Sequence, residues 1–222
     1  MAAGSSLAQY CNRLHATLSK EDHFVDSLSQ ICLRSPQGWR PLGKRKSEEL
    51  CEMSFLLAYT SWEQFLDSSY EFCLAVPEKH IRHLRRMVTA RNLGTASELM
   101  KGDWRSYVDW SDPDIALKRA RTYFLEGEPF ATAISGALIQ LRIMHVVRDS
   151  IAHRSKHSAD KLEARVRDLF GSRRNLTPGG LLLAPPPPRL VPTATTVRYP
   201  TTFKLFLSIL DACSHLINSG VP

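Results

Sequence analysis

The chain of 222 residues has the composition of an ordinary globular protein, with 43% hydrophobic and 23% charged residues. No apolar run approaches the roughly 18 residues that a membrane span needs, and the first residues lack the basic start and apolar block of a signal peptide. We therefore expect a cytoplasmic protein with no membrane association. The formal net charge of +7 favours an anionic partner such as nucleic acid.

The five cysteines are spread along apolar stripes, at positions 11, 32, 51, 73 and 213. None forms a C-x-x-C pair, and none lies near a histidine at metal-ligand spacing. We expect all five to be small buried hydrophobes in a reducing compartment. The sequence predicts neither a metal site near the motif described below nor a cofactor.

Two long amphipathic helices are expected in the first third of the chain. Apolar residues recur every three or four positions over 7–32, and Pro36, Gly38 and Pro41 end that pattern. The basic triplet 44–46 is expected to lie in a loop. The same periodicity runs from about Ser47 to Pro77. Two such seams are typical of an antiparallel pair in a helical bundle.

A strongly basic stretch follows the second helix. It contains Lys79, Arg82, Arg85 and Arg86, whose spacings of three and four residues would put much of the charge on one side of a helix. Such a run is most simply a solvated surface. The alternative is that these four side chains contact the phosphate groups of RNA.

The second half of the chain is also predicted to be helical. The sequence "SDPD" at 111–114 is a good helix start, and a short helix follows to Phe124. A further helix is expected from about Phe130 through the stretch "VVRDSIAHRS" at 146–155, and a last helix over 203–217. The segment 176–200 is rich in proline and predicted to be irregular, with leucines 181–183 packed down. No strand is expected, so the predicted class is all-α, in one domain over 1–222.

Arg148 and His153 stand near the end of the helix that starts at Phe130. They could simply complement the negative end of the helix macrodipole. However, Arg148 falls close to the apolar stripe of Ile134, Leu138 and Leu141. A charge on an apolar stripe must be paired or must face a partner surface, and this favours an active site.

The stretch "RDSIAH" at 148–153 resembles the R-x4-6-H motif of HEPN domains. Three further stretches occur in the order usual for the RiboL-PSP type of that family, namely "YTSWEQFLDSSY" at 59–70, "YVDWSDPDIALKRARTYFLEGEPF" at 107–130 and "LTPGGLLL" at 176–183. The resemblance covers the chain from about residue 45 to its C-terminus. It implies an antiparallel helical bundle of HEPN type, with the proline-rich segment before the C-terminal helix.

The family's implied activity is a metal-independent endoribonuclease. RNA carries its own nucleophile, the 2′-OH, so the enzyme needs a proton-transfer group and a cation for the charge of the transition state. The imidazole of His153 can move protons near neutral pH, and the guanidinium of Arg148 can hold two phosphate oxygens. The products implied are a 2′,3′-cyclic phosphate and a 5′-OH.

Other residues receive weaker roles. Many active family members carry Asn after the arginine where this chain has Asp149, which either orients Arg148 and His153 or neutralises Arg148. Glu63 is either a solvated neighbour of a core tryptophan or a supporting residue. Arg154 and His157 either line an RNA path or face solvent, and His145 is expected to be structural.

A homodimer is expected, with two copies of the motif facing each other across a two-fold axis. The motif gives one cation and one proton carrier per chain, whereas the reaction needs charge stabilisation and proton movement at both the attacking and the leaving oxygen. The resemblance supports this arrangement. It alone implies the cellular role of a toxin or antiphage-defence effector with an antitoxin or a defence-system partner protein. The alternative function is a non-catalytic HEPN subunit that binds RNA or scaffolds a larger complex.

Overall fold

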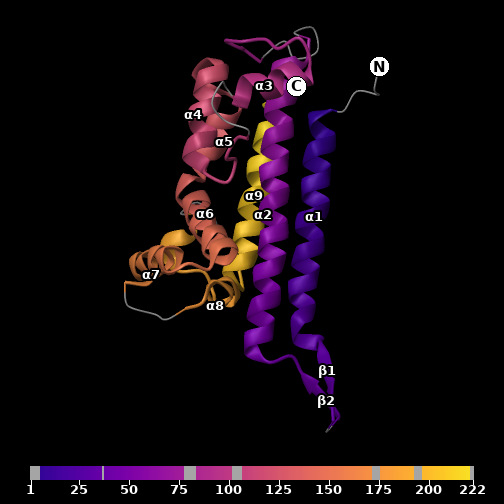
Figure 1. Ribbon diagram of the computed structural model, residues 1–222, viewed down its shortest axis with the longest axis vertical. Coiled ribbons are helices and arrows are strands. Elements are labelled where there is room, and N and C mark those ends of the chain that lie inside the picture. The colour runs from indigo at the N-terminus through magenta and orange to yellow at the C-terminus, as the bar shows by residue number, and fades with distance from the viewer. Residues whose placement is uncertain are drawn as a thin grey trace. The chain divides into compact units, whose positions relative to one another are not determined.

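The computed structural model describes residues 6–36, 38–77, 84–101, 107–171, 176–192 and 197–220. Helices dominate these residues (Figure 1). In chain order the elements are α1 Leu7–Ser27, η1 Leu28–Gln30, β1 Cys32–Ser35, β2 Gly38–Pro41, α2 Lys44–Ala75, α3 Leu93–Lys101, α4 Pro113–Tyr123, η3 Leu125–Gly127, α5 Phe130–Gly136, α6 Leu138–His153, α7 Lys156–Phe170, α8 Pro178–Leu183, η4 Pro188–Leu190 and α9 Thr202–Ser219. The mostly helical class is confirmed.

The chain divides into two compact units. Unit 1 comprises Met1–Ala16, Thr60–Arg142 and Leu210–Pro222, and unit 2 comprises Thr17–Tyr59 and Ile143–Ile209. Helices α1, α2, α6 and α9 each contribute residues to both units. The expected single HEPN-like domain over the whole chain stays a prediction.

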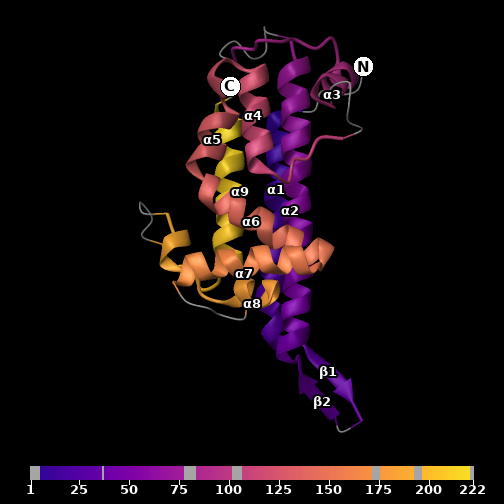
Figure 2. The same ribbon diagram turned by 60° about the vertical axis from the view of Figure 1, so that its left-hand side comes forward.

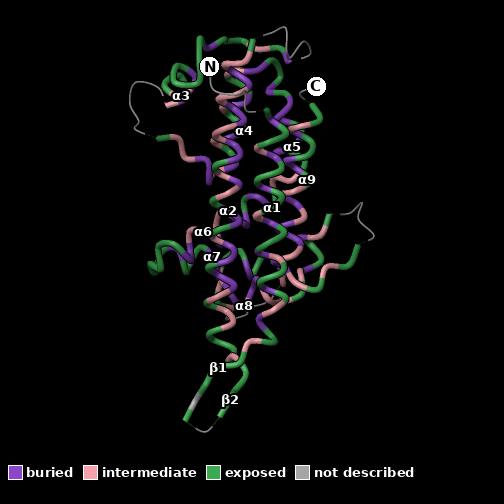
Figure 3. The backbone as a smooth tube through the Cα atoms, turned by 90° about the vertical axis from the view of Figure 1, so that its right-hand side faces the viewer, coloured by how far each residue is buried: buried purple, intermediate pink, exposed green. Residues whose placement is uncertain are grey.

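A small β-hairpin in unit 2 corrects the expectation that no strand is present. Helix α1 ends at Ser27, not near residue 32, and a 3-10 turn leads into β1, which pairs antiparallel with β2. Gly38 at the turn has φ +109°, a conformation that favours glycine. All four residues of β2 are exposed (Figure 3), so the alternation of buried and exposed residues that marks a strand in sequence is missing.

The start of α2 and the middle of the chain also differ from expectation. The basic triplet belongs to the first turn of α2, where Lys44 and Arg45 pair with Glu48 and Glu49 one turn later. The single helix expected from Phe130 is broken at Ala137, which has non-helical backbone angles. By contrast, α4 matches its prediction, and its cap is the Asp112 carboxylate.

Aromatic packing forms the centre of unit 1. The Tyr70 ring stacks on Phe130 with 3.8 Å between centroids and also contacts Trp110 and Phe124. Its hydroxyl donates a hydrogen bond of 2.8 Å to the carbonyl of Ala116. Complete burial of this side chain raises the pKa of the Tyr70 phenol well above its ordinary value, so it stays a neutral donor.

Four of the five cysteines are buried as expected, and Cys32 on the exposed hairpin is the exception. Burial raises the pKa of the Cys51, Cys73 and Cys213 thiols to about 12, with Glu52 adding to the effect at Cys51. These three thiols are therefore unreactive near neutral pH.

The apolar helix expected over 203–217 is confirmed as α9, whose Phe203, Phe206 and Leu210 are completely buried. Its composition is that of a core helix of a globular protein. Among the described residues, no single helix is both long and apolar enough to cross a membrane.

Helix α8 corrects the expectation that the proline-rich segment holds no helix. Pro178 stands in the first turn, where backbone N–H groups have no intrahelical acceptor, so a proline there costs no hydrogen bond. The Thr177 side chain caps the helix by accepting a hydrogen bond from the Gly180 amide. The expected packing of the leucines is confirmed for Leu181 and Leu182, both fully buried.

Helix α8 packs closely against α2 and is held there by two hydrogen bonds. Thr177 Oγ1 donates to the Glu48 carboxylate at 2.8 Å, and the Gly179 amide donates to Glu52 Oε1 at 2.9 Å. A Cβ atom on Gly179 would lie 2.5 Å from the carbonyl oxygen of Glu48. This contact is with backbone, so only a glycine permits the approach.

We predict that Gly179→Ala lowers the free energy of unfolding by about 1–3 kcal/mol, because α8 must move away from α2 to relieve the overlap. The measurement is chemical denaturation followed by circular dichroism. The matched control is Gly136→Ala at the end of α5, where a Cβ meets nothing within 4 Å and the helix would gain up to about 1 kcal/mol. Equal stability of the two variants would contradict the close packing of α8.

Candidate functional site

The predicted motif lies at a sharp change of chain direction between α6 and α7 (Figure 2). Helix α6 ends at His153, and Arg154 takes a left-handed backbone conformation with φ +43°. Ser155 then caps α7 through a capping box, in which its side chain accepts from the Ser158 amide and its own amide donates to Ser158 Oγ. The last turn of α6 and the first turn of α7 are thereby brought together.

This turn creates a pocket of about 270 Å³. Its polar lining includes His145 and His153 from α6, and His157 and Lys161 from α7. Asp149, Val146 and two serines complete the wall. The structure thus brings His153, His157 and Asp149 of the predicted set to one pocket.

Asp149 lies at the centre of the charged groups. Its Oδ1 accepts a hydrogen bond of 3.2 Å from Arg148 Nη1, and its two oxygens lie 3.5 Å from His145 Nε2 and 4.0 Å from His153 Nε2. The two histidines stand four residues before and four after the aspartate, on the same side of α6. The carboxylate therefore offsets part of the positive charge that would otherwise attract an anion.

Arg148 is not among the residues that line the pocket. Its side chain is 27% exposed and donates to Asp149. His153, in contrast, has a side chain that is 63% exposed. Within one chain, the His153 imidazole is thus open to solvent, while the Arg148 guanidinium pairs with Asp149 and does not line the pocket.

Two residues of this region were not predicted to matter. His145 was expected to be structural, yet it lines the pocket, and the i, i+4, i+8 spacing of His145, Asp149 and His153 could have revealed it. Glu52 on α2 is buried, accepts from the Gly179 amide and lies 3.9 Å from Arg154. Glu52 lies more than a hundred positions along the chain from both Gly179 and Arg154, and the sequence carries no signal for such distant contacts.

The remaining predicted site residues are placed as follows. Arg154 is exposed, and its Nη2 lies 3.9 Å from Glu52 Oε2. Its contact with RNA stays a prediction. Glu63 is half-buried on α2 in unit 1, whereas the pocket belongs to unit 2, and its supporting role stays a prediction. Lys79 and Arg82 lie outside the described residues.

The helical interpretation of the basic stretch is wrong for its described part. Residues 84–92 form no helix, and Arg86 makes an isolated antiparallel bridge with Phe124. Arg86 Nη1 donates to the carbonyls of Cys73, Leu74 and Val76 at the end of α2, where a cation complements the negative end of the helix. This contact gives Arg86 a structural role, while Arg85 is exposed.

The pocket histidines are not gathered closely enough to form a metal site. In the described part of the chain, the one group of three His, Cys or acidic residues whose ligand atoms lie within 4.8 Å of one another is His15, Asp211 and His215, in unit 1. The polar lining of the motif's pocket consists of imidazole, ammonium, carboxylate and hydroxyl groups.

Comparison of the chain with family models, with curated proteins and with solved structures found no match.

We predict that Asp149→Asn raises the affinity of the pocket for inorganic phosphate about fivefold. The change removes one negative charge close to the bound anion, worth about 1 kcal/mol in a water-exposed site, and Asn keeps the oxygen that accepts from Arg148. Isothermal titration calorimetry with phosphate measures the effect. Asp168→Asn, at the far end of α7 and 68% exposed, removes the same formal charge and should change little. Equal gains in both variants would show that only net charge matters.

Proposed function

We propose that this protein is a metal-independent endoribonuclease of HEPN type that cleaves RNA by attack of its 2′-OH. The observation that supports the proposal best is the pocket at the α6–α7 turn, which is lined by His145, His153, His157, Lys161 and Asp149. A volume of about 270 Å³ suits a phosphate with part of its ribose. The resemblance of the ordered sequence stretches to HEPN domains supports the same activity.

The reaction requires two proton transfers and one charge to be stabilised. A base takes the proton from the 2′-OH as its oxygen bonds to phosphorus, and an acid gives a proton to the 5′-oxygen as the P–O5′ bond breaks. In the proposal His153 serves as one proton carrier, because it is the most exposed of the groups around Asp149. Arg148 stabilises the negative charge on the phosphate oxygens once RNA competes with Asp149 for its guanidinium.

A second candidate function has one observation in its favour. The ion pair between Arg148 and Asp149 reduces the positive charge available to a phosphate. If RNA does not displace that pair, the protein is a non-catalytic HEPN subunit that binds RNA or scaffolds a complex. For the catalytic form, the resemblance further implies a toxin or antiphage-defence effector controlled by an antitoxin or another defence protein.

We predict that purified protein cleaves total RNA in the presence of EDTA and leaves 2′,3′-cyclic phosphate and 5′-OH ends. His153→Ala and Arg148→Ala should each lower the cleavage rate by at least about a hundredfold, the usual range for losing a proton-transfer group or a charge-stabilising donor. The measurement is a timed cleavage assay with end analysis, alongside circular dichroism of the same samples.

His23→Ala serves as the matched control, since His23 is exposed on α1 and is no part of the pocket. Full activity of the folded His153→Ala protein would contradict the catalytic role. RNA binding without cleavage by the wild type, weakened by Arg148→Ala, would establish the non-catalytic alternative. Cleavage that EDTA abolishes and Mg²⁺ restores would indicate another nuclease chemistry.

We also propose a homodimer in which two motifs share one active site. One chain already offers several imidazoles, but its Arg148 does not line its own pocket, and this favours a partner chain that supplies the guanidinium. An isologous contact would bring the guanidinium of each chain toward the histidines of the other. The apolar stripe expected beside Arg148 takes no part in this contact, because Ile134 and Leu141 are already buried within their own chain.

We predict that mixing inactive Arg148→Ala and His153→Ala chains restores part of the wild-type activity. A mixed dimer contains one intact arginine and one intact histidine at the shared site, and about half of the dimers are mixed after random exchange. Cleavage assays after co-refolding, with analytical ultracentrifugation, test this. A monomer that cleaves at the full rate would contradict the shared site.

A further inference from the structure

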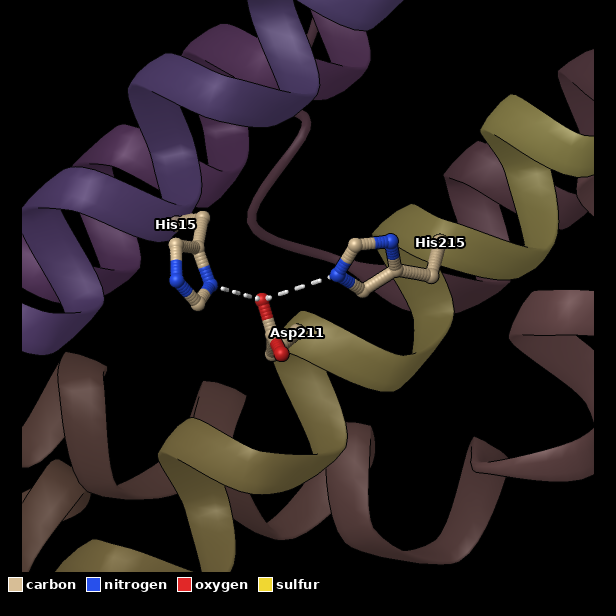
Figure 4. A group of neighbouring side chains, drawn as sticks. All are labelled: His15, Asp211 and His215. Atoms are coloured by element: carbon tan, nitrogen blue, oxygen red, sulfur yellow. Dashed lines mark hydrogen bonds and ion pairs between the residues drawn. The ribbon is translucent and has the colours of Figure 1, made fainter.

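The described part of unit 1 contains a second group of histidines around a carboxylate, unrelated to the R-x4-6-H motif. His15 comes from α1, and Asp211 and His215 come from α9 (Figure 4). Asp211 and His215 are four residues apart, so they lie on one side of α9, and His15 faces them from the neighbouring helix. Both imidazoles point toward the same oxygen of Asp211.

We propose that His15, Asp211 and His215 bind a zinc ion. One ligand atom from each residue lies within 4.8 Å of the other two. Tetrahedral zinc, with bonds of about 2.0–2.2 Å to nitrogen and oxygen, places its ligands about 3.3 Å apart. The separations from Asp211 Oδ1, 2.9 Å to His15 Nδ1 and 3.7 Å to His215 Nε2, lie on either side of that value.

The surroundings of the three side chains allow an ion to enter. The side chains of His15 and His215 are each 60% exposed, so small rotations about their side-chain bonds can close the remaining distance. Asp211 is 30% exposed, which leaves one face of the group open to solvent. A water molecule from that side would supply the fourth ligand that zinc takes in sites with three protein ligands.

His215 is oriented by a buried neighbour. Its Nδ1 lies 4.0 Å from the sulfur of Cys11, which in turn contacts Ser214 Oγ at 3.3 Å. Cys11 is only 2% exposed. With Nδ1 turned toward this contact, Nε2 is the nitrogen that faces Asp211, and a ligating histidine generally has its other nitrogen held in this way.

The donor set selects the class of metal. Ca²⁺ and Mg²⁺ prefer oxygen ligands, and Mg²⁺ keeps most of its own waters. Two imidazoles with one carboxylate suit zinc and the neighbouring late transition metals. Because the ligands come from positions 196 residues apart, a bound ion would also link α1 to α9 and stabilise this part of unit 1.

The test uses the full chain stripped of metal with a chelator and then dialysed. Calorimetric titration with Zn²⁺ should show one equivalent bound, and Zn²⁺ but not Mg²⁺ should raise the melting temperature. His15→Gln, His215→Gln and Asp211→Asn should each weaken Zn²⁺ binding at least about tenfold. Co²⁺ bound to the wild type should give the strong visible absorption of a tetrahedral site, and each of the three variants should lose it.

Two control variants make the result specific. His23→Gln removes an exposed histidine from α1 outside the group and should bind Zn²⁺ like the wild type. His153→Gln, in the pocket of unit 2, should also leave Zn²⁺ binding unchanged. Loss of binding in His153→Gln alone, or no saturable binding by the folded wild type, would overturn the proposal. None of these outcomes bears on the ribonuclease, which is assayed in EDTA.

Discussion

The turn at Arg154 and Ser155 is the constraint on which the candidate site depends. A left-handed residue other than glycine costs about 1 kcal/mol or more, and it persists only where its surroundings hold it. Here the capping box of Ser155 and Ser158 holds the following helix, and Glu52 holds both α8 and, more loosely, the Arg154 side chain. Without the turn, His157 and Lys161 would follow His153 along one side of a single straight helix, whose convex surface encloses no pocket.

The electrostatics of the pocket are set by the position of Asp149. Three groups that can carry positive charge, on Arg148, His145 and His153, lie within 4.0 Å of this one carboxylate. The arrangement holds these side chains in place before any anion arrives, and it lowers their net attraction for one. An anion bound in the pocket would have to compete with Asp149 for these groups.

Two histidine–carboxylate groups thus exist in the described residues, and they differ in geometry. In the pocket, Asp149 is flanked by histidines one turn away on either side of the same helix, which keeps their rings apart. In unit 1, His15 approaches Asp211 from a different helix, which brings both imidazoles to one oxygen. The first geometry suits proton transfer around an anion, and the second suits the shared coordination of a cation.

Local patterns in the sequence determined several features of this protein. The 3.6-residue periodicity predicted the helical class, the cap residues predicted the start of α4, and the spacing of Arg148, Asp149 and His153 predicted a charged cluster at a helix end. The break at Ala137 and the exposed hairpin escaped prediction. A helix break without a proline leaves the hydrophobic periodicity of the sequence unchanged. A strand with both faces exposed produces no alternation of apolar and polar residues.

Only the tertiary structure decided which distant residues meet. Arg86 belongs to a basic run in sequence, yet it satisfies carbonyls at the end of α2. Glu52 reaches the Gly179 amide, and His15 reaches Asp211, across 127 and 196 positions of the chain. The physical reason is that periodicity and caps act within a few turns of one helix, whereas these contacts arise when apolar faces of separate helices pack and carry their polar neighbours with them.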